Sequence, residues 1–409
     1  MLLDVGVEQA LDIVLGSVSA LDGESRPLLE CLGAVLAEDV AADMDIPPFD
    51  NSAMDGYAVQ ASDTSAASPD EPVALRVTAD LPAGYLPRGM LRPGEAVRIM
   101  TGAPLPPGAD AVVRTEDVRR LDDTILVSNP VRPGDDIRRA GEDVARGEVI
   151  LRQGTVIRPA EVGMLATLGR VQALVVRKPR VAVLTTGYEL VAPDEPVAPG
   201  KIRNSNLYSI SAQVKACGGE PILLGVARDT ADELESKIRR GMAEADMLLT
   251  SGGVSVGDYD VVKTVLGRVG EILFWKVKMR PGSPVTFGRI QDKPMFGLPG
   301  NPSASMVAFE QFVRPAILKM AGHSKLRRRQ VQAILEEAVK NRPGVRNFLR
   351  AVATKQNGEW RVRPAGAQGS GILRTMVRAN ALLVVPETVS RMQPGERATV
   401  QLIDLPEVE

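Results

Sequence analysis

Between residues 178 and 321, short apolar runs alternate with amphipathic runs of helical period, and this pattern constrains the fold more than any other. Runs such as "RVAVLTTG", "PILLGVARD" and "DMLLTSGG" are typical of buried strands. The run "TADELESKIRRGMAEA" reads as a helix, with Thr230 and Glu233 spaced as a capping box. A last helix is expected from Ser303 to Ala321. This alternation predicts a parallel sheet with helices on both faces.

The segments on either side have a different pattern. Val7, Leu11 and Val14 fall on one face of an opening helix, and helical period returns around residues 160–169. From 73 to 131, short β-rich pieces separated by Gly/Pro turns predict a small β barrel or sandwich. Beyond residue 325 the chain is again β-rich. We therefore expect an N-terminal module split around a β insertion, and a separate C-terminal β domain.

The composition limits the kinds of ligand and catalytic site that the chain is expected to have. A formal net charge of −2 gives no overall attraction to nucleic acid or to anionic membranes. The single histidine, His323, argues against a histidine-based zinc site or a Ser-His-Asp triad. Cys31 and Cys217 form no motif, which suits a reducing compartment. The start of the chain does not resemble a signal peptide, and no apolar run reaches the roughly 18 residues of a membrane span. A cytoplasmic location is expected.

Four segments follow predicted strands: "TTGYEL", "ARDT", "TSGGVSVGDYD" and "GLPGNPS". Since ligands of open parallel sheets bind at the carboxyl ends of the strands, these segments are expected to meet at one crevice. Their glycines allow backbone N–H groups to approach an anion. The turn from Thr250 to Lys263 could cradle a phosphate, hold a cation, or only reverse the chain. Asn301 could cap the next helix, and Pro302 suits its first turn.

Three carboxylates, Glu189, Asp229 and Asp260, follow these strand ends. Carboxylates beside a phosphate are unfavourable unless a cation lies between them, and Mg²⁺ commonly fills that place. The alternative is that they are ordinary acids of first helical turns, where the helix dipole favours them.

Two further stretches are candidates. In "FWKVKMRPGSP", Lys276, Lys278 and Arg280 would share one face of a strand, as a cationic row or as a solvated edge. The acidic loop "PPFDNSAMDGYAV" contains Asp55, and "IMTGAPLPPGADAVV" exposes Thr101 on a turn. Turn chemistry alone could account for either loop.

Taken together, "PPFDNSAMDGYAV", "RIMTGAPLPPGADAVV", "TSGGVSVGDYD", "RPGSPVTFG" and "FGLPGNPSAS", in this order, closely resemble the molybdopterin molybdenumtransferase family of MoeA and the gephyrin E domain. The resemblance implies α/β plus β architecture in four domains. These are a split elongated domain (1–47 and 140–178), a β-rich insertion (48–139), a three-layer molybdopterin-binding α/β domain (179–325) and a C-terminal β barrel (326–409). It further implies a homodimer that inserts molybdate into adenylylated molybdopterin with Mg²⁺ and releases AMP.

The resemblance also implies roles for individual residues. The catalytic residues would be Asp55, Asp229, Asp260, Glu189 and Lys276, with Asp260, Glu189 and Asp229 at the metal. Those binding substrate would be Thr101, Arg138 (or its neighbour Arg139), Ser251, Gly252, Gly253, Ser255, Arg280, Pro299, Gly300, Pro302, Arg350 and Ser370. Lys276 and Arg280 would lie roughly 13 Å apart along one strand face, too far for both to hold one ion. We therefore hypothesise that Lys276, with Arg350 and Ser370, holds the oxyanion while Arg280 clamps the phosphate end of the substrate.

The chain departs from the family pattern at Tyr188, Arg280 and Ser283, which leaves the choice between molybdate and tungstate open. One alternative function is the preceding step, molybdopterin adenylyltransferase. Another is a gephyrin-like scaffold or cofactor carrier without turnover. Expected partners are the adenylyltransferase, apo-molybdoenzymes and cofactor chaperones. The basic run from Lys325 to Arg329 is interpreted as a solvated face, so neither nucleic acid nor membrane is an expected partner.

Overall fold

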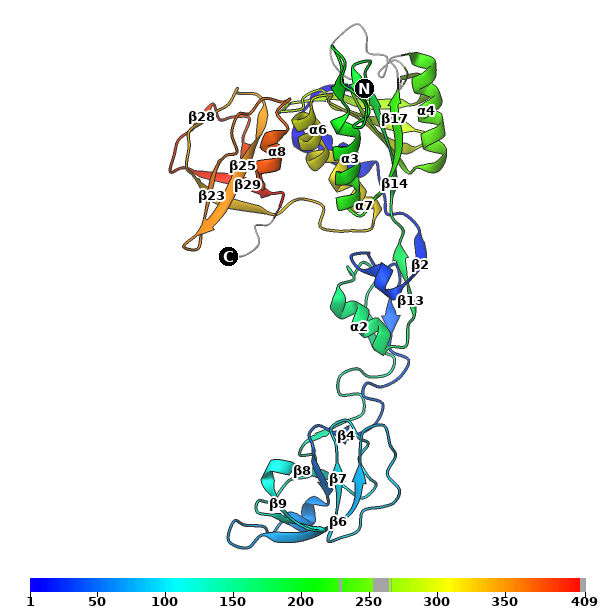
Figure 1. Ribbon diagram of the computed structural model, residues 1–409, viewed down its shortest axis with the longest axis vertical. Helices are drawn as coiled ribbons and strands as arrows, with labels where there is room; N and C mark the ends of the chain where they lie inside the picture. Colours follow the sequence, from blue (N-terminus) through cyan, green and yellow to red (C-terminus); the bar gives the residue numbers. More distant parts are fainter. Residues whose placement is uncertain (228–229, 253–264, 266, 405–409) are drawn as a thin grey trace. The chain divides into compact units, whose positions relative to one another are not determined.

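The computed structural model describes residues 1–227, 230–252, 265 and 267–404. These form two compact units, of which the first comprises Met1–Ala37, Gly154–Val162 and Gln172–Glu409, and the second Glu38–Gln153 and Gly163–Val171 (Figure 1). No helix in the described ranges has the length and apolar character needed to cross a membrane.

The first unit contains a seven-stranded sheet. Its strands, in spatial order, are β1 (Leu2–Val5), β19 (Glu271–Val277), β21 (Thr286–Ile290), β22 (Lys293–Leu298), β18 (Met247–Ser251), β14 (Arg180–Thr186) and β17 (Glu220–Ala227). The predicted parallel arrangement holds from β22 to β17. It is wrong for β21, which runs antiparallel to both neighbours. The cause is the two-residue turn Gln291–Asp292, whose positive φ angles of 49° and 62° close a tight hairpin with β22.

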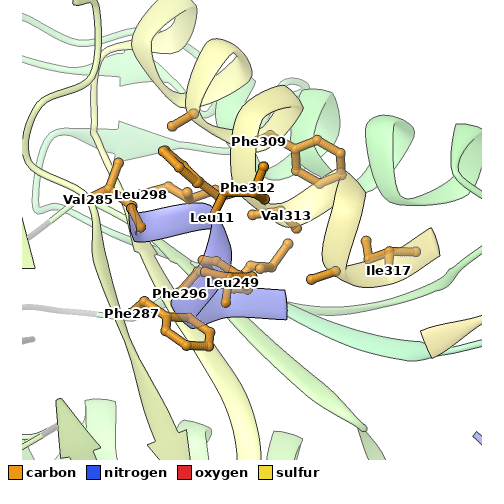
Figure 2. Close-up of a cluster of buried hydrophobic side chains, with 14 of the residues drawn as sticks. Leu11, Leu249, Val285, Phe287, Phe296, Leu298, Phe309, Phe312, Val313 and Ile317 are labelled. Atoms are coloured by element: carbon orange, nitrogen blue, oxygen red, sulfur yellow. The ribbon is translucent and has the colours of Figure 1, made fainter. Parts of the chain in front are cut away.

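Helices cover both faces of this sheet, as predicted. One layer contains α1 (Val7–Gly16), α3 (Ser205–Ala216), α6 (Pro302–Ala308), a π-helical turn (Phe309–Val313) and α7 (Arg314–Met320). Figure 2 shows apolar side chains of these helices meeting those of the strands, for example Phe312 and Phe296. On the other face lies α4 (Ala231–Glu244), through Leu234 and Ile238. The α/β domain is therefore three-layered.

Several local predictions need correction. Thr230 and Asn301 do precede α4 and α6, but neither side chain makes a capping hydrogen bond. The first elements also differ from the sequence-based grouping of residues 1–47. Strand β1 pairs in parallel with β19, and α1 packs against α7, so residues 2–16 lie with the α/β sheet.

The C-terminal domain is a closed barrel, as expected. Its strands are β25 (Arg346–Gln356), β26 (Glu359–Pro364), β23 (Gln330–Leu335), β29 (Arg397–Leu402) and β27 (Ala381–Val385). The barrel closes because β25 pairs with both β26 and β27. Strand β20 (Met279–Arg280) extends from the α/β domain and pairs in parallel with β25, so the two domains share backbone hydrogen bonds.

The second unit contains the predicted β insertion as a six-stranded sheet: β8 (Ala111–Arg114), β5 (Gly56–Val59), β7 (Glu95–Ile99), β6 (Val73–Leu81), β10 (Thr124–Val127) and β9 (Val118–Leu121). Smaller pairs elsewhere are β2 (Gly23–Pro27) with β13 (Gln172–Val176), β3 (Val40–Ala41) with β12 (Val149–Leu151), β4 (Asn51–Ser52) with β11 (Ile137–Arg138), β15 (Leu190–Val191) with β16 (Ile202–Arg203), and β24 (Val339–Lys340) with β28 (Arg391–Met392). Further helices in the described ranges are α2 (Pro159–Thr167), α8 (Arg374–Arg378) and the short 3-10 helices Leu28–Cys31, Ala61–Thr64 and Thr115–Asp117.

Candidate active site

The carboxyl ends of β14, β18 and β22 surround a crevice of about 480 Å³. The sequence predicted this meeting of strand ends, and the crevice brings together the following predicted residues: Glu189, Ser251, Gly252, Pro299, Gly300 and Pro302. The predicted residues Asp229, Gly253, Ser255 and Asp260 lie outside the described residues.

A buried asparagine that the sequence analysis missed connects these loops. Asn206, in the first turn of α3, donates through Nδ2 to Ser251 Oγ at 2.8 Å and to the Gly300 carbonyl at 2.7 Å. Ser251 Oγ in turn donates to the Pro299 carbonyl at 3.1 Å. One amide group thus fixes the ends of β18 and β22 relative to α3. The signal was the "RNSN" string directly before a helical run, since an asparagine pair at a helix start that faces a crevice is suited to such bonds.

Close backbone approach makes Gly252 necessary at the end of β18. Its φ is +96°, and an added Cβ would lie 2.6 Å from the Thr186 carbonyl oxygen on β14. The wall here also holds two buried acceptors, Thr186 Oγ1 and Asn206 Oδ1, that have no hydrogen-bond partner within the described part of the chain. Most buried polar atoms in proteins have a hydrogen-bond partner, so these two atoms of the wall are exceptions.

The expected metal site can be tested only in part. Glu189 is exposed at the crevice, and its carboxylate lies over Gly187. No group of three His, Cys, Asp or Glu side chains suited to a metal ion occurs among the described residues. Of the three predicted metal ligands, Glu189 is the one that lies at the crevice among the described residues, and Asp229 and Asp260 lie outside them.

A second cavity, of about 660 Å³, lies where the α/β domain meets the barrel. Arg280 and Lys340 line it together with Ser283, Gln368 and Ser370, and none of its described lining residues is acidic. We call it the junction cavity. Ser370 Oγ accepts a hydrogen bond of 3.1 Å from Asn301 Nδ2, and Asn301 lines the strand-end crevice. The two cavities are thus neighbours across one side-chain hydrogen bond.

The predicted cationic row of Lys276, Lys278 and Arg280 does not exist as one strand face. Lys276 has a φ of +68°, and β19 ends one residue later, whereas Arg280 belongs to β20 and pairs with the barrel. The positive φ breaks the alternation of a strand, so Phe274 and Val277 are both buried. Lys276 Nζ lies 5.1 Å from the centre of the Trp275 ring.

Arg350 does not present its guanidinium to a cavity as an oxyanion contact, because its side chain is wholly buried. It donates through Nε to Thr375 Oγ1 at 3.1 Å and through Nη2 to the Gly369 carbonyl at 2.9 Å. Burial lowers the pKa of Arg350. Arg350 is therefore a positioning residue that holds the segment before Ser370.

The second unit carries its own ordered polar cluster. Asp55 accepts hydrogen bonds from the Thr101 backbone N–H at 2.8 Å and from the Thr101 hydroxyl at 2.7 Å. The bond from the backbone N–H, followed by that from the hydroxyl, lowers the pKa of Asp55. Arg139 forms an ion pair of 2.6 Å with Asp50, whereas exposed Arg138 has no ion pair within the described ranges. Of the two arginines, Arg138 is the one left available for a ligand.

The sheet, the barrel and the two polar cavities together define a class of protein: a multi-domain α/β protein with a crevice at its strand ends and a C-terminal barrel. Three family models match it in chain order. They are the MoeA N-terminal region, domains I and II, over residues 5–169, a probable molybdopterin binding domain over 182–319, and the MoeA C-terminal region, domain IV, over 332–403.

Relatives match over nearly the whole chain. Molybdopterin molybdenumtransferase 2 of Mycobacterium tuberculosis is 40% identical over 91% of this chain and 93% of its own length. The molybdopterin molybdenumtransferase of Bacillus subtilis is 38% identical over 92% of this chain and 89% of its own. The crystal structure of the molybdopterin biosynthesis MoeA protein of Pyrococcus horikoshii is 34% identical, covers 98% of this chain and 99% of its own, and has a TM-score of 0.85. The chain belongs to the molybdopterin molybdenumtransferase (MoeA) family and is a transferase.

Proposed function

We propose that this protein inserts molybdenum from molybdate into adenylylated molybdopterin and releases AMP, giving the molybdenum cofactor. The observation that carries the proposal is the adjacency of two cavities suited to anions, whose walls are joined by the hydrogen bond from Asn301 to Ser370. The strand-end crevice offers a glycine-rich wall and the N-terminal end of α3, both suited to a phosphorylated pterin. The junction cavity offers two cations without an acid among its described lining residues.

The geometry favours a division of roles that differs from the one expected from the sequence. Molybdate is a compact dianion and needs at least two preorganised cationic or N–H donor groups. Arg280 and Lys340, with the Ser370 hydroxyl between the cavities, would supply them. Arg350 would act through Ser370 by fixing the loop that carries it. Asn206, Ser251 and Gly252 would shape the pterin-phosphate side.

The proposal also includes a metal ion and a homodimer. Mg²⁺ would assist at the phosphoanhydride. Glu189 is a candidate ligand at the crevice, and Asp229 and Asp260 are candidate ligands that lie outside the described residues.

A homodimer would bring the exposed Asp55–Thr101 pair of one subunit to a partner's crevice, because that ordered pair is free at the surface of its own unit. The adenylyltransferase, apo-molybdoenzymes and cofactor chaperones remain proposed partners, and the cytoplasm the proposed location.

The decisive experiment uses the full chain with adenylylated molybdopterin, Mg²⁺ and increasing molybdate. AMP release and activation of an apo-molybdoenzyme are followed together. Lys340→Gln is expected to raise the molybdate concentration needed for half-maximal AMP release by about tenfold, the effect of losing one charge-assisted contact. Lys355→Gln, at the exposed end of barrel strand β25, serves as the matched control.

The alternatives give different results in the same assay. An adenylyltransferase would consume ATP and release pyrophosphate, and this alternative is not favoured by the full-length matches. A scaffold or carrier would bind the pterin without turnover. Absence of AMP release from wild-type protein at saturating molybdate would refute the proposed reaction.

A further inference from the structure

A third cavity, of about 420 Å³, lies at the other end of the α/β domain, where α3 and α7 end and the segment leading into β14 begins. Five cationic side chains line it: Arg26, Lys178, Lys215, Arg314 and Arg328. None of its described lining residues is acidic. We call it the basal cavity. Helix α3 separates it from the strand-end crevice, and its 12 residues span about 18 Å.

The basal cavity holds more positive charge than its ion pairs neutralise. Arg26 pairs with Glu24. Glu310, which is nearly fully buried, contacts Arg328 at 2.9 Å and lies 3.9 Å from Arg314. Five cations therefore face two carboxylates, an excess of three positive charges among the described ion pairs.

Part of this excess is desolvated, which makes it costly. The side chains of Arg314 and Arg328 are 15% and 29% exposed. Burial, and then the charge of Arg328, lowers the pKa of Arg314. The Cys217 thiol in the wall adds no negative charge, because burial raises its pKa to about 12. Like charges held in a low-dielectric wall repel each other, and an anion would relieve that repulsion.

The cations are not needed to cap the two helices. At the end of α3, the Cys217 and Gly219 N–H groups already bond to the carbonyls of Gln213 and Val214. At the end of α7, the His323 N–H bonds to Leu318 and the Gly322 N–H to Lys319. The last-turn carbonyls that cations commonly satisfy are thus occupied by backbone donors. Hydrogen bonding to the helix ends therefore does not account for the five cations.

We propose that the basal cavity binds an oxyanion of the phosphate type carrying at least two negative charges, held by Lys178, Lys215, Arg314 and Arg328. The volume admits a free phosphate or the phosphoryl group of a nucleotide. The site is separate from the proposed molybdenum insertion, since none of its residues lines the crevice or the junction cavity.

The test is calorimetric titration of the full-length protein with inorganic phosphate, and in a second arm with AMP. The double variant Lys178→Gln/Lys215→Gln changes two exposed side chains and is expected to fold normally. It should weaken one phosphate site by about tenfold or more, because each lost contact is charge-assisted. Lys355→Gln is the control, and Lys340→Gln reports separately on binding in the junction cavity.

The outcomes are distinct. Loss of one phosphate site in the double variant, with AMP release unchanged, supports the basal site. If the AMP arm is weakened equally, the ligand is the phosphoryl group of a nucleotide, and if only the phosphate arm is weakened, it is the free anion. An unchanged number of sites and unchanged affinity in the double variant would overturn the proposal, whatever the result of the molybdenum-insertion assay.

Discussion

Replacing Asn206 by alanine should loosen the crevice more than any other single change among its described side chains. Its amide bonds Ser251 and Gly300, the ends of two strands that meet only through tertiary structure. Ser251 is buried, with 2% of its surface exposed, whereas Gly300 is exposed at the crevice. Alanine keeps α3 helical but donates to neither group. The change therefore isolates the coupling between the helix and the strand ends.

The expected loss in the free energy of unfolding follows from these contacts. Leaving the buried Ser251 Oγ without this donor costs about 1–3 kcal/mol, and losing the hydrogen bond to the exposed Gly300 costs about 0.5–1.5 kcal/mol. Removing Asn206 Oδ1, which has no partner among the described residues, returns about 1 kcal/mol, and alanine's better helix propensity returns about 0.5 kcal/mol. The net loss in the free energy of unfolding is about 0–3 kcal/mol, centred at about 1.5 kcal/mol. At about 2–4 °C per kcal/mol for a domain of this size, the centre of that range lowers the unfolding midpoint by about 3–6 °C.

Calorimetric unfolding and steady-state AMP release would be measured together. The KM for adenylylated molybdopterin should rise more than kcat falls, because the residue shapes binding and does not touch the reacting bond. Tyr208→Ala, at a half-exposed position on the same helix, is the control for helix propensity. If the Asn206→Ala protein had the unfolding midpoint and the KM of the wild type, the assigned role of Asn206 would be refuted.

Three further predictions follow from local geometry. Gly252→Ala forces a φ of +96° on alanine and places its Cβ 2.6 Å from a backbone oxygen of β14, so urea unfolding should show a loss of about 2–3 kcal/mol. Thr101→Val removes one hydrogen bond from Asp55, so the pKa of that carboxyl, followed by NMR, should rise toward its ordinary value; an unchanged pKa would contradict the assigned cause. The hydrogen bonds of Arg158 hold the pKa of Glu161 at about 2, below 4.5. The stability that this pair contributes is present above pH 4.5 and lost as the pH falls toward 2, and Glu161→Gln should flatten that part of the stability profile.

Sequence reasoning worked well where the signal was local. The apolar runs marked β14, β17, β18 and β22 with their helices, and the glycine and proline clusters marked the loops that follow them. The strand ends then had to meet, because the carboxyl ends of parallel strands share one edge of a sheet. Ser251, Gly252 and Gly300 could be placed in one crevice on that ground alone.

Sequence reasoning failed where the position of a side chain depends on a segment far away in the chain. The alternation of Lys276, Lys278 and Arg280 looked like one strand face, but a positive φ at Lys276 and pairing of Arg280 with the barrel divide the run between two sheets. Arg350 looked like a ligand for an anion, yet the loop before Ser370 encloses it.

The sequence by itself determined the alternation of strands and helices from β14 to β18, the β character of the insertion and the C-terminal domain, and several residues that gather at the strand ends. Only the tertiary structure decided which cations face a cavity, placing Arg280 beside Lys340, and which polar group, Asn206, joins the loops. The physical reason is that periodicity records burial along one element. Charge and hydrogen-bond partners, by contrast, come from elements that are far apart in the chain and adjacent only after folding.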